Sequence, residues 1–338
     1  MSLAVALTPG SDATVDAVVA KLRPAVAAGA GELVLSFDDV PEQGAGARHR
    51  DLTVGVRAAL GVPVWVVPTH YAGQERSPYL DELCAGLPDD ALVMWTGPAV
   101  VPDEITAGQA RERAAACGGR APLLWDNVPV NDGPMADRLS VGPLEGRESA
   151  LRAELAGALW NPMLQAEASL LTLASAAAWW RGEDPEAAWA AEVERRGLTT
   201  FVGGVLGRGL PDDPVALRAV LRAWRDCAAP TLGDEVAPWL DALHAEAALG
   251  VAALDVLAVV ADGNHDPERL TALVFRLLSW RQVRAAPVSV LGGRLATRPV
   301  LDQDDRGHFR IRAGMVVERD TVVDGLVRGA LGAVGALG

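Results

Sequence analysis

The sequence predicts an α/β protein that begins as a TIM-type (β/α) barrel and continues as an α-helical bundle. Two patterns indicate this. Short apolar runs alternate with helical stretches through about the first 146 residues, which is typical of parallel βαβ units. After that point the chain becomes rich in Ala, Leu and Trp at helical spacing, which is typical of packed helices.

The strands of the first part are predicted from apolar runs that stop abruptly in polar or Gly/Pro-rich segments. Leu33 to Phe37 is the clearest, because a continuous apolar run of this length indicates a strand buried on both faces. Predicted strands end near residues 8, 38, 68, 96, 126 and 142. The last of them, Leu139–Gly142, carries the weakest pattern.

Two architectures fit this alternation, an open doubly wound sheet and a barrel. The dinucleotide fingerprint G-x-G-x-x-G is absent after the first strand, and the glycine cluster Gly203–Gly209 is interpreted as a loop. Polar and aromatic residues gather instead at the carboxyl ends of several strands, where barrel active sites are assembled. The pattern therefore favours a barrel.

We expect three domains: a catalytic barrel at 1–146, a helical bundle at 147–285, and a small β-containing appendix with a terminal helix at 286–338. The first bundle helix is expected at 149–159. The apolar segment Ala247–Ala261 contains Asp255 and fits a buried helix better than a membrane span.

The 338-residue chain carries a net charge of −14, and Lys21 is its sole lysine. Without a basic stripe, this composition argues against nucleic acid or an anionic membrane as partner. Three scattered cysteines favour a reducing compartment. Because no signal peptide is recognised, the prediction is a cytoplasmic protein, with a longer secreted form as the alternative.

Asp38 and Asp39 follow the strongest predicted strand directly. Two adjacent carboxyl groups at the end of a buried strand repel each other, which raises the pKa of one. Such a pair supplies a protonated acid beside a charged carboxylate at neutral pH. The alternative is that one Asp caps the next helix while the other is solvated.

Trp125 and the loop after it form a second candidate, with Asn127 and Asp132 among four carboxylate or amide side chains in seven residues. A ring beside amides and carboxylates suits a sugar face and its hydroxyls. An ordinary Asx-rich turn is the alternative.

Tyr71 and Asn161 each have an equally simple structural explanation. Tyr71 ends a predicted strand, where its phenol can donate into a pocket or pack as a core tyrosine. Asn161 precedes Pro162 and is explained by helix N-capping alone. The five histidines are dispersed without metal-ligand spacing, so a zinc site is not expected.

Read together, the strand ends resemble glycoside hydrolase family 84. This family contains β-N-acetylglucosaminidases that remove O-linked N-acetylglucosamine, and bacterial members often labelled hyaluronidases. The six motifs occur in the family order and are Ser36–Val40, Val67–Tyr71, Trp95–Pro98, Trp125–Asp132, Gly142–Leu144 and Asn161–Met163.

The resemblance implies a retaining exo-β-N-acetylglucosaminidase in which the substrate's own 2-acetamido oxygen is the nucleophile, and it implies no metal or cofactor. It implies that Asp38 orients and polarises the acetamido group, while Asp39 is the general acid and then the general base. Substrate-binding roles are implied for Tyr71 beside the acetamido oxygen, Trp125 at the acetyl pocket, Asn127 at the acetamido region, Asp132 at the 4- and 6-hydroxyls, and Asn161 at another hydroxyl.

The chain departs from the family pattern at its start. A first strand ending in a Glu-Gly-Phe-Tyr-Gly-type motif and a second unit with a sugar-binding lysine are not found, so about six of eight βα units are expected. An incomplete barrel leaves open edges that proteins normally cover. The expectations are therefore a fragment of a longer enzyme, a homo-oligomer that covers the edges, or a non-catalytic carbohydrate-binding or interaction remnant.

Overall fold

The computed structural model describes residues 3–38, 45–263, 267–278, 288–292, 294–303 and 309–335. The chain forms two compact units. The first contains residues 1–128, 144–161 and 176–183, and the second contains residues 129–143, 162–175 and 184–338. The chain thus passes more than once between the units, whereas the three domains expected from the sequence are consecutive; that division stays a prediction.

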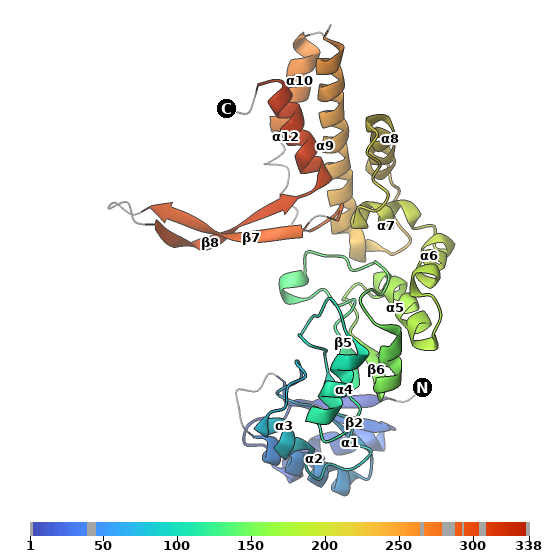
Figure 1. The fold of residues 1–338 in the computed structure, drawn as a ribbon, viewed down its shortest axis with the longest axis vertical. Helices are drawn as coiled ribbons and strands as arrows, with labels where there is room; N and C mark the ends of the chain where they lie inside the picture. Colours follow the sequence, from blue (N-terminus) through green and yellow to red (C-terminus); the bar gives the residue numbers. More distant parts are fainter. Residues whose placement is uncertain are drawn as a thin grey trace. The chain divides into compact units, whose positions relative to one another are not determined.

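The first unit, which is coloured mostly blue to green in Figure 1, is built on six described strands that are parallel and follow one another in sequence order. A parallel bridge between Val66 and Val93 joins the two halves of the sheet. The strands are β1 (Ala4–Leu7), β2 (Glu32–Ser36), β3 (Val64–Val67), β4 (Met94–Trp95), β5 (Leu123–Asp126) and β6 (Gly157–Trp160). The α/β class and parallel pairing are as expected. Because β1 and β6 each pair with one neighbour among the described strands, closure into a barrel stays a prediction.

Helices connect the first five strands: α1 (Val15–Ala27), α2 (Gly46–Leu60), α3 (Pro78–Cys84) and α4 (Ala107–Ala116). Alternate residues of the strands face opposite sides. Leu33, Leu35 and Val66 pack with residues of α1, α2 and α3. On the other face of the sheet, a smaller apolar cluster contains Val34, Val67, Met94 and Leu123, with Trp65, Tyr71, Leu92 and Trp125 packed against it. We call the four buried residues Val34, Val67, Met94 and Leu123 the inner-face cluster.

Two predicted elements near the end of the sheet are wrong. Leu139–Gly142 is not a strand, and Leu139 and Val141 are instead buried in the core of the second unit. The helix expected at 149–159 is a 3₁₀ segment, Ser149–Glu154, followed by β6. Gly157–Trp160 pairs with Leu123–Asp126. The hydrogen bonds gained along this edge of β5 therefore outweigh the helical preference of the Ala- and Leu-containing stretch.

The second unit is mostly helical: α6 (Pro185–Arg195), α7 (Thr199–Leu206), α8 (Pro214–Arg225), α9 (Ala237–Asp262), α10 (Pro267–Leu278) and α12 (Val322–Ala333). Helix α5 (Ala166–Arg181) contributes residues to both units. Strands β7 (Arg294–Gln303) and β8 (Phe309–Asp320) form an antiparallel pair before α12, where a β-containing segment and a terminal helix were expected.

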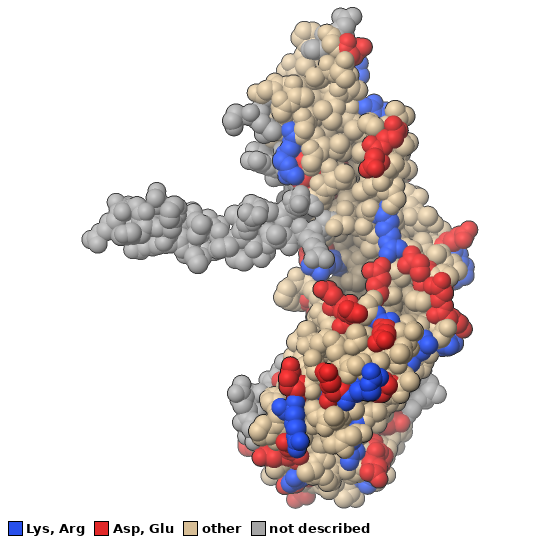
Figure 2. All heavy atoms as spheres, in the orientation of Figure 1, with Lys and Arg blue, Asp and Glu red and all other residues tan. Residues whose placement is uncertain are grey.

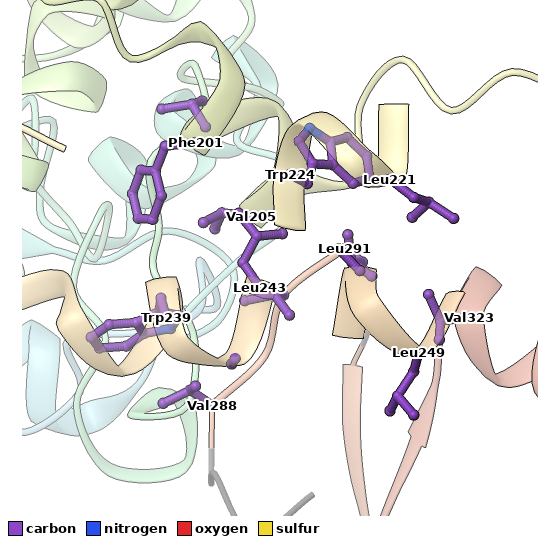
Figure 3. Close-up of a cluster of buried hydrophobic side chains, with 14 of the residues drawn as sticks. Phe201, Val205, Leu221, Trp224, Trp239, Leu243, Leu249, Val288, Leu291 and Val323 are labelled. Carbon is purple, nitrogen blue, oxygen red and sulfur yellow. The ribbon is translucent and has the colours of Figure 1, made fainter. Parts of the chain in front are cut away.

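Helix α9 is the centre of this unit, and α8, α10 and α12 all pack on it. Figure 3 shows Trp239, Leu243 and Leu249 of α9 among apolar side chains of α7, α8 and α12. By length and composition, residues 234–262 could cross a membrane, but 56% of the apolar window is buried within the protein. A buried core helix passes the same test, so this is weak support for a membrane span.

Helix α7 contains Gly203 and Gly204, so the loop predicted at Gly203–Gly209 is wrong for these two residues, while Gly207 and Gly209 lie in the turn after the helix. A Cβ at Gly204 would lie 2.6 Å from a methyl carbon of Leu243 on α9. The glycine therefore serves close packing against α9 rather than a turn, a use that sequence alone does not distinguish.

Gly46, in the first turn of α2, provides the sharpest packing test of the first unit. A Cβ there would overlap the backbone carbonyl oxygen of Tyr79 and lie 2.9 Å from the Cβ of Glu82 on α3. We expect Gly46→Ala to lower the free energy of unfolding by about 1–3 kcal/mol, measured by urea denaturation, because backbone atoms cannot move aside as a side chain can.

Gly108→Ala is the matched control, since Gly108 lies in the first turn of α4 and an added Cβ would meet Thr106 Oγ1 at an ordinary contact distance of 3.7 Å. Alanine favours a helix more than glycine does, so this variant should be as stable as the parent or more so. Equal stability of the two variants would contradict the close α2–α3 contact.

Candidate active site

At the carboxyl edge of the sheet, backbone pairing continues beyond the ends of the strands. Phe37 N donates to Val67 O (2.8 Å), Thr96 N to Tyr71 O (3.0 Å), and Asn161 N to Asp126 O (2.9 Å). The first and third bonds continue the register of the strands, whereas the second ties the loop that carries Tyr71 to the end of β4. The candidate site lies at this edge.

Tyr71 and Trp125 come from different strand ends but pack against the same inner-face cluster. Both side chains are half-buried. An open hollow of about 370 Å³ lies beside Tyr71, lined among others by Thr69, His70, Val100 and Arg113. Its volume is in the range of small-ligand sites.

Asp38 is half-buried and follows the buried ring of Phe37, which stacks on His49 of α2 with ring centroids 3.8 Å apart. Since the ladder reaches Phe37, alternation places Asp38 on the side of the sheet that Val34 faces. This is the inner face, with Tyr71 and Trp125. Asp39 lies outside the described residues, so the unequal acidity expected of the pair stays a prediction.

The phenol of Tyr79 fixes the backbone two residues before Tyr71. Thr69 N donates to Tyr79 Oη (2.9 Å), and Tyr79 Oη lies 3.0 Å from His49 Nδ1. Burial raises the pKa of the Tyr79 phenol, which therefore keeps its proton at neutral pH. Helix α3 thus holds the start of the loop that carries Tyr71.

Asn127 and Asn161 are brought together by the structure. Asn161 Nδ2 donates to Asn127 Oδ1 (3.1 Å), and Asn127 Nδ2 donates to Val100 O (2.8 Å). Asn127 therefore ties three strand ends together and is more than a local Asx turn. The capping explanation for Asn161 is wrong, because the residue follows β6 and α5 begins only at Ala166.

Asp126 belongs to the polar loop expected to contact a ligand, yet its carboxylate is fully buried and bound to Arg147. Nε and Nη2 of Arg147 donate to the two carboxylate oxygens at 2.8 and 2.7 Å. Arg147 Nη1 also reaches the carbonyl oxygens of Pro102, Asp103 and Glu145 at 3.1–3.3 Å. This pair is structural and holds the loops around β5.

Asp132 is exposed and precedes the 3₁₀ segment Gly133–Met135 in the second compact unit. Its expected role at the sugar hydroxyls therefore stays a prediction.

Sequence reasoning missed two buried arginines, Arg147 and Arg113. A signal for Arg113 existed: with Ala110 and Cys117 it follows the three- and four-residue spacing of a buried helix face, a stripe normally filled by apolar residues. Arg147 gave no such signal, since it lies in irregular chain.

Comparison with known proteins identifies the family of this chain and its relatives. Residues 1–200 match the family model for beta-N-acetylglucosaminidase. The protein O-GlcNAcases of Rattus norvegicus and Mus musculus are each 30% identical over 200 residues, covering 52% of this chain and 22% of the relative. The chain thus spans about a fifth of the length of these curated relatives.

Two solved structures share the fold. A mutant of the Thermobaculum terrenum O-GlcNAc hydrolase superimposes with a TM-score of 0.74 at 20% identity, covering 100% of this chain and 82% of that one. The structure of CpGH84B superimposes with a TM-score of 0.75 at 18% identity, covering 97% and 64%. At these identities the likeness concerns the fold alone.

The buried Asp126–Arg147 pair makes a stability prediction. We expect Asp126→Asn to lower the free energy of unfolding of the chain by about 3–5 kcal/mol in urea denaturation, because it leaves the buried guanidinium without its counter-charge.

Asp90→Asn is the control, since it also removes a two-pronged Arg–Asp pair from the first unit, but its partner Arg57 and Asp90 itself are solvent-exposed. Its loss should be much smaller. Similar losses for the two variants would show that burial of the Asp126 pair carries no special cost.

Proposed function

This chain belongs to the beta-N-acetylglucosaminidase family, glycoside hydrolase family 84, and we propose that it is a retaining exo-β-N-acetylglucosaminidase acting on terminal β-linked N-acetylglucosamine. The observation that carries the proposal is the packing of Tyr71 and Trp125 against the inner-face cluster at the carboxyl edge of the sheet, within the segment that matches the family; strand alternation assigns Asp38 to the same face. Partly buried aromatic rings beside carboxylates suit the apolar face and polar groups of an N-acetyl sugar.

The proposed reaction uses the substrate as its own nucleophile. The acetamido oxygen attacks C1 of the sugar while the glycosidic bond breaks, and Asp39 gives its proton to the leaving oxygen. Water then attacks C1 of the resulting oxazoline, the bond from C1 to the acetamido oxygen breaks, and Asp39 takes a proton from the water. Asp38 orients the acetamido N–H and stabilises the positive charge that develops on the ring.

The remaining residues are proposed to bind the sugar. The phenol of Tyr71 hydrogen-bonds near the acetamido oxygen, and the ring of Trp125 forms one wall of the acetyl pocket. Asn127 contacts the acetamido region, Asn161 a sugar hydroxyl, and Asp132 the 4- and 6-hydroxyls. The hydrogen bond between Asn161 and Asn127 supports the roles proposed for these two residues, since it fixes both amides next to the carboxyl end of β5.

Wider features of the molecule remain proposals as well. We propose that the sheet is part of a (β/α) barrel and that the helical second part follows it as a bundle. The natural substrate is proposed to be an N-acetylglucosamine-containing glycoside or glycoprotein. A cytoplasmic location and a role without nucleic acid or membrane stay predictions.

On the face drawn in Figure 2, acidic and basic side chains of the described residues are interspersed.

The direct test is hydrolysis of 4-methylumbelliferyl N-acetyl-β-D-glucosaminide by the purified chain. We expect Asp39→Asn to lower kcat by roughly 10²- to 10⁴-fold, the usual contribution of general acid–base catalysis, while circular dichroism shows an intact fold. Asp90→Asn, an exposed aspartate of the same unit, should keep full activity. Turnover retained in Asp39→Asn would overturn the assignment of the acid, and a folded parent chain without turnover would favour the non-catalytic binding role.

Substrate assistance has its own test. Replacing the N-acetyl group of the substrate by N-trifluoroacetyl draws electrons from the carbonyl oxygen and weakens it as a nucleophile. We expect kcat/KM for the chain to fall with each added fluorine. A rate independent of fluorination would indicate that an enzyme carboxylate attacks instead.

A further inference from the structure

The loop from β3 to α3 carries Tyr71 and is held at several backbone positions. Tyr71 O accepts from Thr96 N (3.0 Å), and Gly73 N donates to Gly97 O (2.9 Å). Gly73 has a φ of +83°, so the chain turns sharply two residues after Tyr71. The loop is therefore attached to the end of β4 at Tyr71 and again at the turn itself.

Arg113 of α4 is attached to the same loop. Its Nη2 donates to His70 O (2.7 Å) and its Nη1 to Gly73 O (3.5 Å). Trp95 Nε1 donates to the same Gly73 oxygen (2.8 Å). One planar guanidinium thus contacts the carbonyl groups just before and two residues after Tyr71, and such a fork fixes direction as well as distance.

Burying this cation is costly, which calls for a reason. Arg113 is only 1% exposed, and its Nε has no hydrogen-bond partner in the described structure. The groups that face it are the thiols of Cys117 and Cys84 and the phenol of Tyr79, and burial lowers the pKa of the guanidinium. The hydrogen bonds described for Arg113 both go to the Tyr71 loop, so its charge is met there by carbonyl dipoles.

We infer that Arg113 is a positioning residue for Tyr71: it holds residues 70–73 so that the phenol keeps its place beside the inner-face cluster. This inference rests on the proposed function only for its kinetic consequence. Arg113 acts through the backbone of the loop, while Tyr71 contacts the sugar.

The kinetic test is a double-mutant cycle with the fluorogenic substrate. We expect Arg113→Met to lower kcat/KM by roughly 10- to 100-fold in the parent chain, as a small misplacement of a binding group does. In a Tyr71→Phe background the same change should cost less than about threefold, because the hydroxyl that needed positioning is gone. Equal factors in both backgrounds would overturn the inference, since a general loss of stability acts alike in each.

Two further variants sharpen the cycle. Arg113→Lys keeps the buried positive charge but not the fork, and it should recover part of the activity; it also carries the test if Arg113→Met does not fold. Arg120→Met is the matched control, because Arg120 donates to the carbonyl oxygens of Leu87 and Pro88 in the loop that precedes β4. It should leave kcat/KM unchanged.

A readout without catalysis separates this inference from the proposed function. By hydrogen exchange, the amides of Gly73 and Thr96 should exchange at least about tenfold faster in Arg113→Met, while that of Leu33 keeps its rate. The same comparison applies to Arg113→Lys. Unchanged exchange at Gly73 and Thr96 in Arg113→Met would refute the positioning role even if the parent chain is an active enzyme. If exchange is faster in Arg113→Met but the parent chain shows no hydrolysis, the positioning role holds and only the proposed hydrolase function is refuted.

Discussion

The candidate site depends on backbone hydrogen bonds that join the chain just beyond the strand ends. The bonds from Phe37 to Val67 and from Asn161 to Asp126 continue the parallel ladder in register, and the bond from Thr96 to Tyr71 ties the loop after β3 to the end of β4. Because side chains alternate, a slip by one residue would exchange the faces of Trp125 and Asp126. The ladder thus separates an aromatic ring on the inner face from a buried ion pair on the other.

Arginine side chains supply hydrogen-bond donors to the backbone carbonyl groups of the irregular chain around the sheet. Backbone carbonyl groups in loops have no regular partners, and buried ones must find donors. Arg147 serves the carbonyls of three loop residues, Arg113 those of the Tyr71 loop, and Arg120 those of Leu87 and Pro88. With a single lysine in the chain, nearly all its positive charge resides on a side chain whose five donors suit this use.

The sequence was most informative where local pattern decides structure. The first five strands and the helices between them follow from apolar runs and caps, and the ends of these strands placed Asp38, Tyr71 and Trp125 at one edge. β6 escaped prediction because its pairing with β5 is a non-local interaction that outweighs its own preference. Gly204 was misread for a related reason, since its value lies in contact with Leu243, about 40 positions away. The role of Asp126 could not be foreseen either, because a buried partner and a sugar hydroxyl demand the same side chain.

The phenol of Tyr79 has a consequence for the chemistry of its neighbours. Its oxygen accepts from Thr69 N and lies 3.0 Å from His49 Nδ1, so a single hydroxyl serves both a backbone amide and the imidazole that stacks on Phe37. A phenylalanine at position 79 would fill the same space yet strip both a backbone amide and an imidazole nitrogen of this shared partner. Tyr79→Phe, usually regarded as the mildest exchange for tyrosine, is therefore a polar defect here, and the residue types at positions 49 and 79 constrain each other.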